Sequence, residues 1–275
     1  MNNPLVEKYF RQDMLPHIWC SGCGNGILLM NLVEAIDALG LEKDKVVIVS
    51  GIGCSSRASG YLDFNTIHTT HGRAIPVATG IKMAKPELTV IVITGDGDAT
   101  AIGGNHFIHG SRRNIDLTVL VFNNNIYGMT GGQYSPTTGL GEFGTTAPYG
   151  NIDQPFDITT LAAASGATYV GRSTAAHHEL TVRLIKNAIT HKGFSVLDLL
   201  SMCPTYYGRK NRKGDAVAMM KGMKQNSVTV QRAETMQAEE LEGKVVIGEI
   251  HVSSRPEYSD EYKRLTAIAK GRAAK

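Results

Sequence analysis

Residues 88–98, LTVIVITGDGD, decide the fold that this sequence predicts. The first seven residues form a nearly uninterrupted apolar, β-branched run, which is typical of a strand buried on both faces of a parallel sheet. Two glycines around Asp96 then allow a tight turn and a close approach of the backbone to a ligand. A second run, Ile115–Phe122, leads directly into Asn123, Asn124 and Asn125. Two buried strands therefore each end in polar residues.

The same pattern repeats along the chain, because short apolar runs alternate with stretches of helical period. This alternation predicts an α/β fold with a doubly wound parallel sheet covered by helices on both faces. The expected strands are 45–50, 88–94, 115–122, 167–170 and 194–200, and the expected helices are 26–39, 73–84, 99–112, 158–164 and 175–191. Gly166 and Gly193 follow two of these helices and are expected to stop them.

The remaining segments carry weaker patterns. Residues 128–150 are rich in glycine and polar residues, and we interpret them as one long ordered loop. Beyond Pro204 we expect a helix at 215–224, an apolar run at 245–250 and a charged tail. The predicted organisation is one α/β domain over residues 1–204, followed by an extension over 205–275 that packs on this domain and on a partner subunit.

Composition limits the class of protein. The chain has 275 residues, 42% of them hydrophobic, which can supply a substantial core. Its apolar runs are too short to cross a membrane, and its start lacks the pattern of a secretion signal, so we expect a cytoplasmic protein. A net charge of +3 is too small to indicate a nucleic-acid partner. The one basic cluster, residues 209–213, is interpreted as a solvated loop.

Asp96 and Asn124 together predict a cation site. Ligands of parallel α/β sheets bind at the carboxyl ends of the strands, where both residues fall. A carboxylate, an amide and a backbone carbonyl near Ile126 could give Mg²⁺ three of its preferred oxygen ligands, with a bound diphosphate and water completing the shell. Either motif alone would be better explained by turn chemistry, but their combination predicts a magnesium-bound diphosphate.

The four cysteines are a second feature. Cys20 and Cys23 form a C-x₂-C pair, Cys54 follows the first strand, and Cys203 follows the last. In a reducing compartment such thiols are more often metal ligands or redox groups than disulfides. A Cys₄ zinc site usually has two close pairs and a thioredoxin-like pair follows a strand, so neither matches well, and the spacing alone leaves an iron–sulfur cluster and zinc both open.

Several motifs that contain these residues resemble the motifs of one known protein family. GDG followed about thirty residues later by NN resembles the thiamine diphosphate signature. CSGCGNG (20–26), GIGCSSR (51–57), HGRAIPVATGIK (71–82) and GDGDATAIGG (95–104) resemble the β subunit of 2-oxoacid:ferredoxin oxidoreductases, most closely its 2-oxoglutarate branch. The resemblance covers nearly the whole chain to about Pro204.

The resemblance implies three cofactors. Mg²⁺ would be held by Asp96, Asn124 and the Ile126 carbonyl, and one [4Fe–4S] cluster by Cys20, Cys23, Cys54 and Cys203. Thiamine diphosphate would be bound by residues on four loops, namely Ile52, Gly53, Cys54, Ser55, His71, Gly97, Asp98, Gly128 and Met129.

The implied reaction is the reversible, coenzyme A-dependent oxidative decarboxylation of 2-oxoglutarate to succinyl-CoA and CO₂. Electrons would pass through the cluster to ferredoxin, and a separate α subunit would carry the pyrimidine-binding domain. Pyruvate or a branched-chain 2-oxoacid are alternative substrates. A non-oxidative thiamine lyase and a noncatalytic, zinc-stabilised binding module are alternative functions.

Three residues are candidates for binding or activating the substrate. Arg57 is our candidate for binding the substrate carboxylate, because a guanidinium makes bidentate contacts and stays charged, and Arg73 is a second candidate. By resemblance, His71 would hydrogen-bond the diphosphate or the reacting oxygen. The spacing of His68, His106 and His109 supports no catalytic role.

Overall fold

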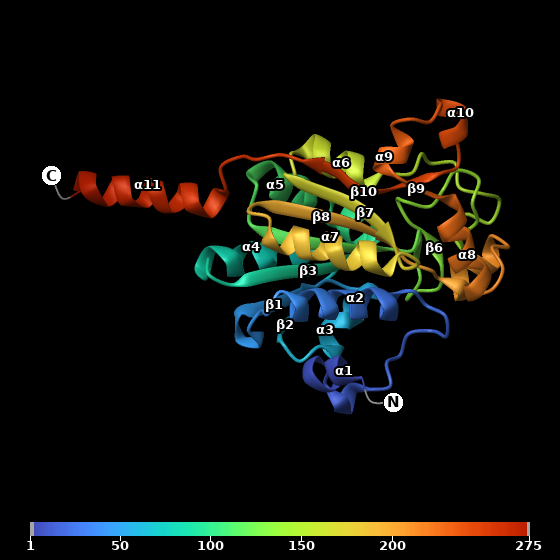
Figure 1. The fold of residues 1–275 in the computed structure, drawn as a ribbon, viewed down its shortest axis with the longest axis horizontal. Coiled ribbons are helices and arrows are strands. Elements are labelled where there is room, and N and C mark those ends of the chain that lie inside the picture. Colours follow the sequence, from blue (N-terminus) through green and yellow to red (C-terminus); the bar gives the residue numbers. More distant parts are fainter. Residues whose placement is uncertain (1–2, 274–275) are drawn as a thin grey trace.

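An eight-stranded sheet forms the centre of the computed structural model, which describes residues 3–273. The strand order is β2-β1-β3-β4-β8-β7-β10-β9 (Figure 1). All neighbouring pairs are parallel except β7 and β10, which are antiparallel. The strands are β1 (Val46–Ser50), β2 (Asn65–His68), β3 (Thr89–Gly95), β4 (Leu117–Asn123), β7 (Tyr169–Thr174), β8 (Phe194–Leu200), β9 (Ser227–Thr229) and β10 (Val245–Val252).

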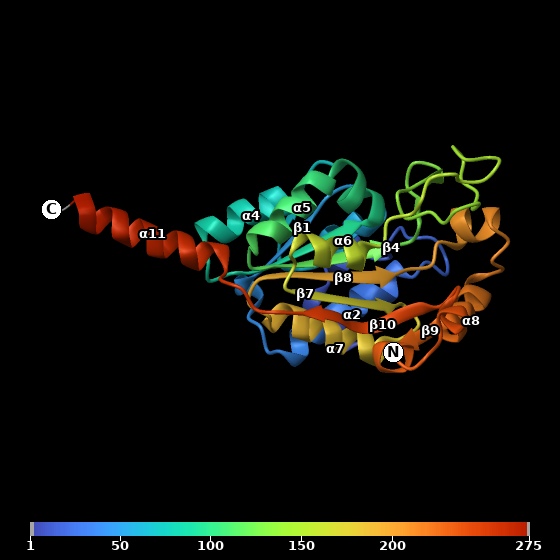
Figure 2. The same cartoon turned by 90° about the horizontal axis from the view of Figure 1, so that it is seen from above.

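Helices cover both faces of this sheet, which confirms the doubly wound fold (Figure 2). One face carries α4 (Ala74–Ala84), α5 (Gly104–Arg113) and α6 (Ile158–Ser165), and the other carries α2 (Asn25–Ala38) and α7 (His178–Thr190). The two predicted stop glycines follow α6 and α7, and both have positive φ angles. Residue 166 takes the left-handed conformation at the end of α6, where glycine has no Cβ to clash.

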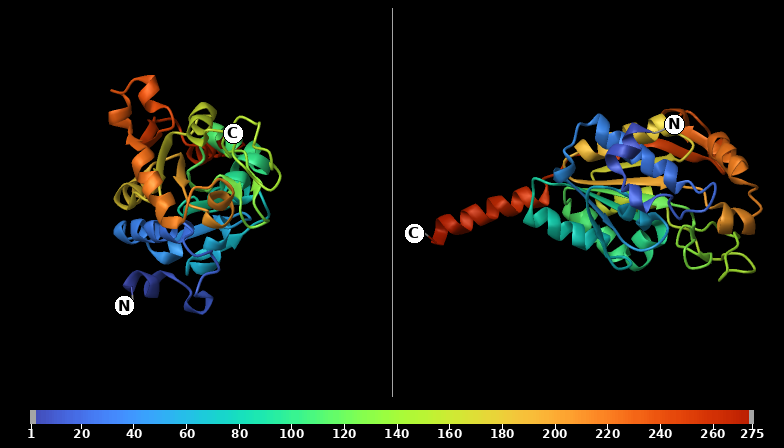
Figure 3. Two further views of the ribbon diagram at one scale, coloured as in Figure 1. Left: turned by 90° about the vertical axis from the view of Figure 1, so that its right-hand side faces the viewer. Right: turned by 90° about the horizontal axis from the view of Figure 1, so that it is seen from below.

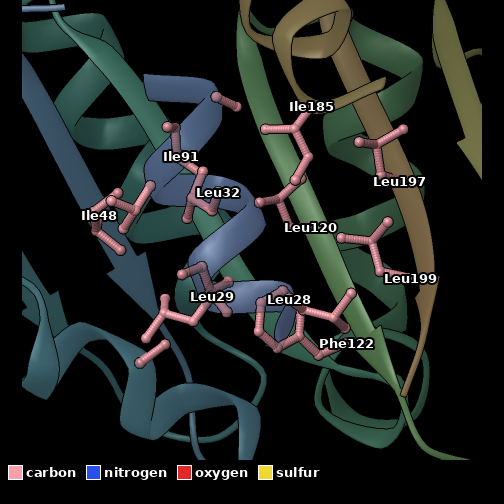
Figure 4. Close-up of a cluster of buried hydrophobic side chains, with 14 of the residues drawn as sticks. Leu28, Leu29, Leu32, Ile48, Ile91, Leu120, Phe122, Ile185, Leu197 and Leu199 are labelled. Atoms are coloured by element: carbon pink, nitrogen blue, oxygen red, sulfur yellow. The ribbon is translucent and has the colours of Figure 1, made fainter. Parts of the chain in front are cut away.

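The alternation of side chains along each strand divides the core into two layers. On β4, Leu120 and Phe122 pack toward α2 and α7, whereas Val119 and Val121 pack toward α4, α5 and α6. Figure 4 shows the first layer, where Leu28, Leu29 and Leu32 of α2 meet side chains of β1, β3, β4 and β8. Because both faces of the inner strands are buried, their sequences are continuous apolar runs rather than alternating ones.

Several elements differ from the expected pattern. The segment after GDG begins with a π-helical turn, η4 (Asp98–Ile102), before α5 starts. The edge strand β2 was not predicted, and the tail expected to be only charged forms the helix α11 (Tyr258–Ala273). The other elements are α1 (Pro4–Tyr9), η1 (Gln12–Met14), η2 (Lys43–Lys45), η3 (Ser55–Arg57), α3 (Ala58–Tyr61), β5 (Ile126–Tyr127), β6 (Gln133–Tyr134), η5 (Pro204–Gly208), α8 (Ala216–Asn226), α9 (Val230–Ala233) and α10 (Ala238–Leu241).

The segment beyond Pro204 completes the same sheet. β9 and β10 extend its edge next to β7, and α11 then projects away from the body as an isolated helix (Figures 1 and 3). The division at residue 204 and the packing of the extension on a partner subunit stay predictions. Over residues 3–273, none of the helices combines the length and the apolar character that crossing a bilayer requires.

Candidate active site

The carboxyl ends of β1, β3, β4 and β8 bring the predicted site residues to one end of the sheet, on the right in Figure 2. Two neighbouring cavities open there. The first, which we call the diphosphate cavity, has a volume of about 210 Å³. It is lined by all nine residues expected to contact thiamine diphosphate and by the three expected magnesium ligands: Ile52, Gly53, Cys54, Ser55, His71, Asp96, Gly97, Asp98, Asn124, Ile126, Gly128 and Met129.

Asp96 is the most deeply held of the three expected magnesium ligands, with 2% of its surface exposed. Its Oδ2 accepts hydrogen bonds from the hydroxyls of Ser135 and of Thr137, the latter at 2.8 Å. Burial raises the pKa of Asp96, and these two hydrogen bonds oppose that rise. Among residues 3–273, the one hydrogen bond to Oδ1 from another residue is a long one of 3.4 Å from the backbone N–H of Asn124. The carboxylate therefore has one oxygen fixed by the protein and one with capacity to spare.

The donor set around Asp96 fits a hard cation. The Oδ1 of Asn124 accepts a hydrogen bond from the Ile126 N–H at 3.2 Å, which holds the amide and the following backbone together. Carboxylate, amide and carbonyl oxygens are the ligands that Mg²⁺ takes in proteins, usually beside substrate phosphates and water. Sequence reasoning missed Ser135 and Thr137, although both lie in the polar loop that it singled out.

Asp98, which is expected to contact the cofactor, lines the diphosphate cavity and is also held by contacts within the protein. Its Oδ1 accepts the Gly72 N–H at 2.7 Å and lies 2.7 Å from Nδ1 of His71, while its Oδ2 accepts the Thr94 hydroxyl at 2.7 Å. With 3% of its surface exposed, this carboxylate is occupied by protein donors. Through these contacts Asp98 connects the loop after β3 to the loop that carries His71. Both loops form part of the cavity wall, so Asp98 helps to fix their relative positions.

Close packing requires a glycine at two points in the loops that form this cavity. A Cβ at Gly97 would overlap the ring of Tyr127, and a Cβ at Gly51 would overlap the carboxylate of Asp98. Both glycines therefore allow the loops after β1, β3 and β4 to touch, which larger residues would separate. The π-helical turn η4 follows directly, and such turns are frequent at functional sites.

The second cavity, which we call the thiol cavity, has a volume of about 220 Å³ and is lined by all four cysteines. Burial raises the pKa of Cys23 to about 12 and that of Cys54 to about 11, and the neighbouring thiols add to both rises. Within residues 3–273, no group of three or more His, Cys, Asp or Glu side chains lies close enough together to hold a single metal ion. The four thiols instead lie on the wall of the thiol cavity.

This cavity fits a cluster better than a zinc ion. Zinc bound by four thiolates would hold all four sulfurs at about 2.3 Å from a single ion. A [4Fe–4S] cluster instead separates its thiolates, because each one binds a different iron of the cube. The four-cysteine donor set on the wall of one cavity therefore suits the cluster.

Hydrogen bonds and packing join the loops that carry the cysteines. The indole Nε1 of Trp19 donates to the Cys54 carbonyl at 2.7 Å, which links the first cysteine loop to the second. The backbone N–H of Gly24 donates to the Met202 carbonyl at 3.1 Å, and a Cβ at residue 24 would lie only 2.7 Å from Ser201 Oγ and Met202 N. The glycine after C-x₂-C is thus needed where the first loop meets the end of β8.

The two cavities share one wall. Cys54, Asn124, Gly128 and Met129 line both of them. A Cβ placed on Gly128 would lie 3.3 Å from Cys54 Sγ and 3.8 Å from Cys203 Sγ, so the backbone of the loop after β4 passes directly beside two thiols. Two loops, after β1 and after β4, therefore separate a site that suits a diphosphate from a site that suits a cluster.

The remaining candidates are placed differently. Arg57, expected to bind a substrate carboxylate, lines the thiol cavity and does not line the diphosphate cavity. The reason is local, because the short helix η3 begins after Cys54 and ends at Arg57. Arg73 donates to the Gly72 carbonyl at 3.2 Å, and His106 and His109 lie on α5; none of these lines either cavity.

Comparisons with known proteins agree with this arrangement. Residues 51–199 match the family described as thiamine pyrophosphate enzyme, C-terminal TPP binding domain. The chain is 55% identical to the 2-oxoglutarate synthase subunit KorB of Methanothermobacter marburgensis over 258 residues, which covers 94% of this chain and 90% of that protein. It is also 55% identical to the KorB subunit of Methanocaldococcus jannaschii, with 94% of this chain and 96% of that protein covered.

A solved structure is similar over almost the same length. It is the 2-oxoglutarate:ferredoxin oxidoreductase from Magnetococcus marinus with 2-oxoglutarate, coenzyme A and succinyl-CoA bound. The TM-score is 0.86 at 32% sequence identity, and the match covers 98% of this chain and 92% of that one. From its fold, its two cavities and these similarities, the chain belongs to the KorB family, the β subunits of 2-oxoglutarate synthase.

Proposed function

We propose that this chain is the β subunit of a 2-oxoglutarate synthase that converts 2-oxoglutarate and coenzyme A to succinyl-CoA and CO₂. Relatives with the name of this enzyme are similar over nearly the full chain, and the similar solved structure holds 2-oxoglutarate, coenzyme A and succinyl-CoA. Pyruvate and branched-chain 2-oxoacids are the alternative substrates that the assay below separates.

In this proposal the diphosphate cavity binds thiamine diphosphate through Mg²⁺. Asp96, Asn124 and the Ile126 carbonyl supply oxygen ligands, while Asp98 fixes the loop that carries His71. The cofactor, when bound, supplies an electron sink for decarboxylation of a 2-oxoacid. Ser135 and Thr137 hold one oxygen of Asp96, so that the other can face the cation. Met129, with 46% of its surface exposed, would cover the reactive end of the cofactor.

The thiol cavity would hold a [4Fe–4S] cluster through Cys20, Cys23, Cys54 and Cys203. The observation that carries the proposal is the shared wall, because oxidation requires an electron acceptor close to the site of decarboxylation. Cys54 lines both cavities, so its loop would give electrons a short path from one cofactor to the other. Ferredoxin would then remove the electrons from the protein.

The chain provides only part of a thiamine site. Thiamine enzymes bind the cofactor between a domain for the diphosphate and a domain for the aminopyrimidine, and this fold contains the first. The name of its relatives as a subunit implies a partner chain. We propose that an α subunit supplies the pyrimidine domain and closes the diphosphate cavity.

The test is an anaerobic assay of this chain co-expressed with its α subunit. We expect coenzyme A-dependent reduction of a low-potential dye with 2-oxoglutarate, at least tenfold faster than with pyruvate or a branched-chain 2-oxoacid. Release of the decarboxylated aldehyde without dye reduction would instead indicate a non-oxidative lyase. Zinc in place of iron in the purified protein would contradict the proposed cluster.

A further inference from the structure

Positive charge is concentrated in the segment that follows the last cysteine. Residues 204–226 contain six basic side chains and a single acidic one, a net charge of +5 in a chain whose total is +3. The basic residues are Arg209, Lys210, Arg212, Lys213, Lys221 and Lys224. None of them takes part in the reaction proposed above. A local excess of one charge attracts a partner of the opposite charge.

This basic segment packs directly beside the thiol cavity. The short helix η5 begins after the last cysteine, and its first residues line that cavity. α8 packs on the C-x₂-C loop so closely that a Cβ at Gly22 would overlap the Cβ of Ala216. Lys221 and Lys224 of α8 line a further cavity of about 340 Å³, and Cys23 lines it too. α8 therefore lies at the end of the molecule that holds the proposed cluster site (Figures 1 and 2).

Most of these positive charges have no partner within the described chain. Lys213 pairs with Glu142 at 3.1 Å. Over residues 3–273, no carboxylate lies within ion-pair distance of the other five basic side chains. The one acidic side chain of the segment, Asp215, caps α8 by accepting the Ala218 N–H at 2.8 Å. Four of the five unpaired side chains are exposed, and Lys210 is partly exposed, so their charges are accessible to a partner.

We infer that this basic segment is the docking surface for ferredoxin and that it binds an acidic face of that carrier, an inference that rests on the proposed function. Cys20 is exposed, so a carrier held on this surface would lie close to the cluster. One electron then leaves the reduced cluster and enters a cluster of the oxidised ferredoxin, and no bond forms or breaks. Opposite charges on the two surfaces speed the encounter and orient the partners.

The experiment uses the co-expressed αβ enzyme with the pair Lys221→Gln and Lys224→Gln, or with both lysines changed to glutamate. The control pair is Lys45→Gln and Lys85→Gln, two exposed residues near the amino ends of β1 and β3 that line neither cavity. Binding of a purified, oxidised [4Fe–4S] ferredoxin with a net negative charge is measured by isothermal titration calorimetry at low and at high salt. Dye reduction with 2-oxoglutarate and the KM for coenzyme A are measured on the same proteins.

At low salt we expect the Kd for ferredoxin to rise about tenfold in the glutamine pair and further in the glutamate pair, because attraction is lost and then reversed. A second pair, Arg209→Gln and Arg212→Gln, should weaken binding in the same direction. At about 0.5 M salt all these differences should shrink to about twofold, because salt screens exposed charges. The control pair should bind ferredoxin like the wild type. Dye reduction should be unchanged in every protein, because a small dye needs no docking surface.

Two results would overturn the inference. Ferredoxin binding that is the same in all variants and the wild type at low salt would exclude docking on this surface. Unchanged ferredoxin binding with a KM for coenzyme A raised about tenfold would assign the basic side chains to the phosphates of coenzyme A instead. A wild-type enzyme that reduces no dye with 2-oxoglutarate would refute the proposed function itself. That outcome is separate, because ferredoxin binding is measured without turnover.

Discussion

Replacing Thr137 by valine tests how the protein prepares Asp96 for a cation. Valine keeps the volume of the side chain and removes the hydroxyl that lies 2.8 Å from Asp96 Oδ2 and 3.1 Å from Asn123 Oδ1. A hydrogen bond to a charged group contributes about 1.5–3 kcal/mol. Because this bond orients a proposed magnesium ligand, we expect Mg²⁺ to bind about 10- to 100-fold more weakly in the variant.

Isothermal titration calorimetry of Mg²⁺ into the αβ enzyme saturated with thiamine diphosphate measures this change. The control is Thr190→Val, which removes an exposed hydroxyl in the last turn of α7, where it donates to the Lys186 carbonyl. The control should bind Mg²⁺ like the wild type. A Thr137→Val variant that folds normally and binds Mg²⁺ within twofold of the wild type would refute the role given to this hydroxyl.

Two further substitutions test the packing and the electrostatics of the site region. Gly97→Ala should abolish thiamine diphosphate binding in calorimetry, because the added Cβ overlaps the ring of Tyr127, whereas Gly60→Ala, whose Cβ meets no atom within 4 Å, should bind normally. Equal binding by both would contradict the close packing. Asp157→Asn should lower the free energy of unfolding in urea at pH 7. Burial alone would raise the pKa of Asp157, but the Arg172 charge and several hydrogen bonds lower it to about 2. The folded pKa is thus below the usual value, so the stabilisation is present above pH 4 and is lost as the pH falls toward 2. The shift corresponds to about 2.5 kcal/mol, which we reduce to about 1 kcal/mol because 47% of the side chain is exposed. A variant as stable as the wild type at pH 7 would contradict this.

The sequence predicted those parts of the fold whose physical cause is local. The inner strands, such as β3 and β4, are buried on both faces and so are recognisable as apolar runs. The edge strand β2, with the sequence NTIH, is mostly exposed and carries no such run. The antiparallel direction of β10 depends on its pairing with β7, and α11 contacts little of the body, so neither leaves a clear pattern in the sequence.

The sequence also predicted those site residues that directly follow a strand, but not the loop residues that contact them. Asp96 and Asn124 could be placed together because the carboxyl ends of parallel strands meet at one edge. Ser135 and Thr137 could not be joined to Asp96, since they lie 39 and 41 residues away in a loop without periodicity. The position of Arg57 depends on the short helix η3, whose direction decides which of two adjacent cavities the side chain lines.

The most direct test of the central claim is EPR spectroscopy of the anaerobic αβ enzyme, frozen after 2-oxoglutarate is added. A thiamine site and a cluster separated only by the wall of Cys54 and Gly128 predict a reduced [4Fe–4S] signal that requires 2-oxoglutarate, Mg²⁺ and thiamine diphosphate together. A protein that contains about four iron atoms per β chain but shows no such substrate-dependent signal would contradict the account.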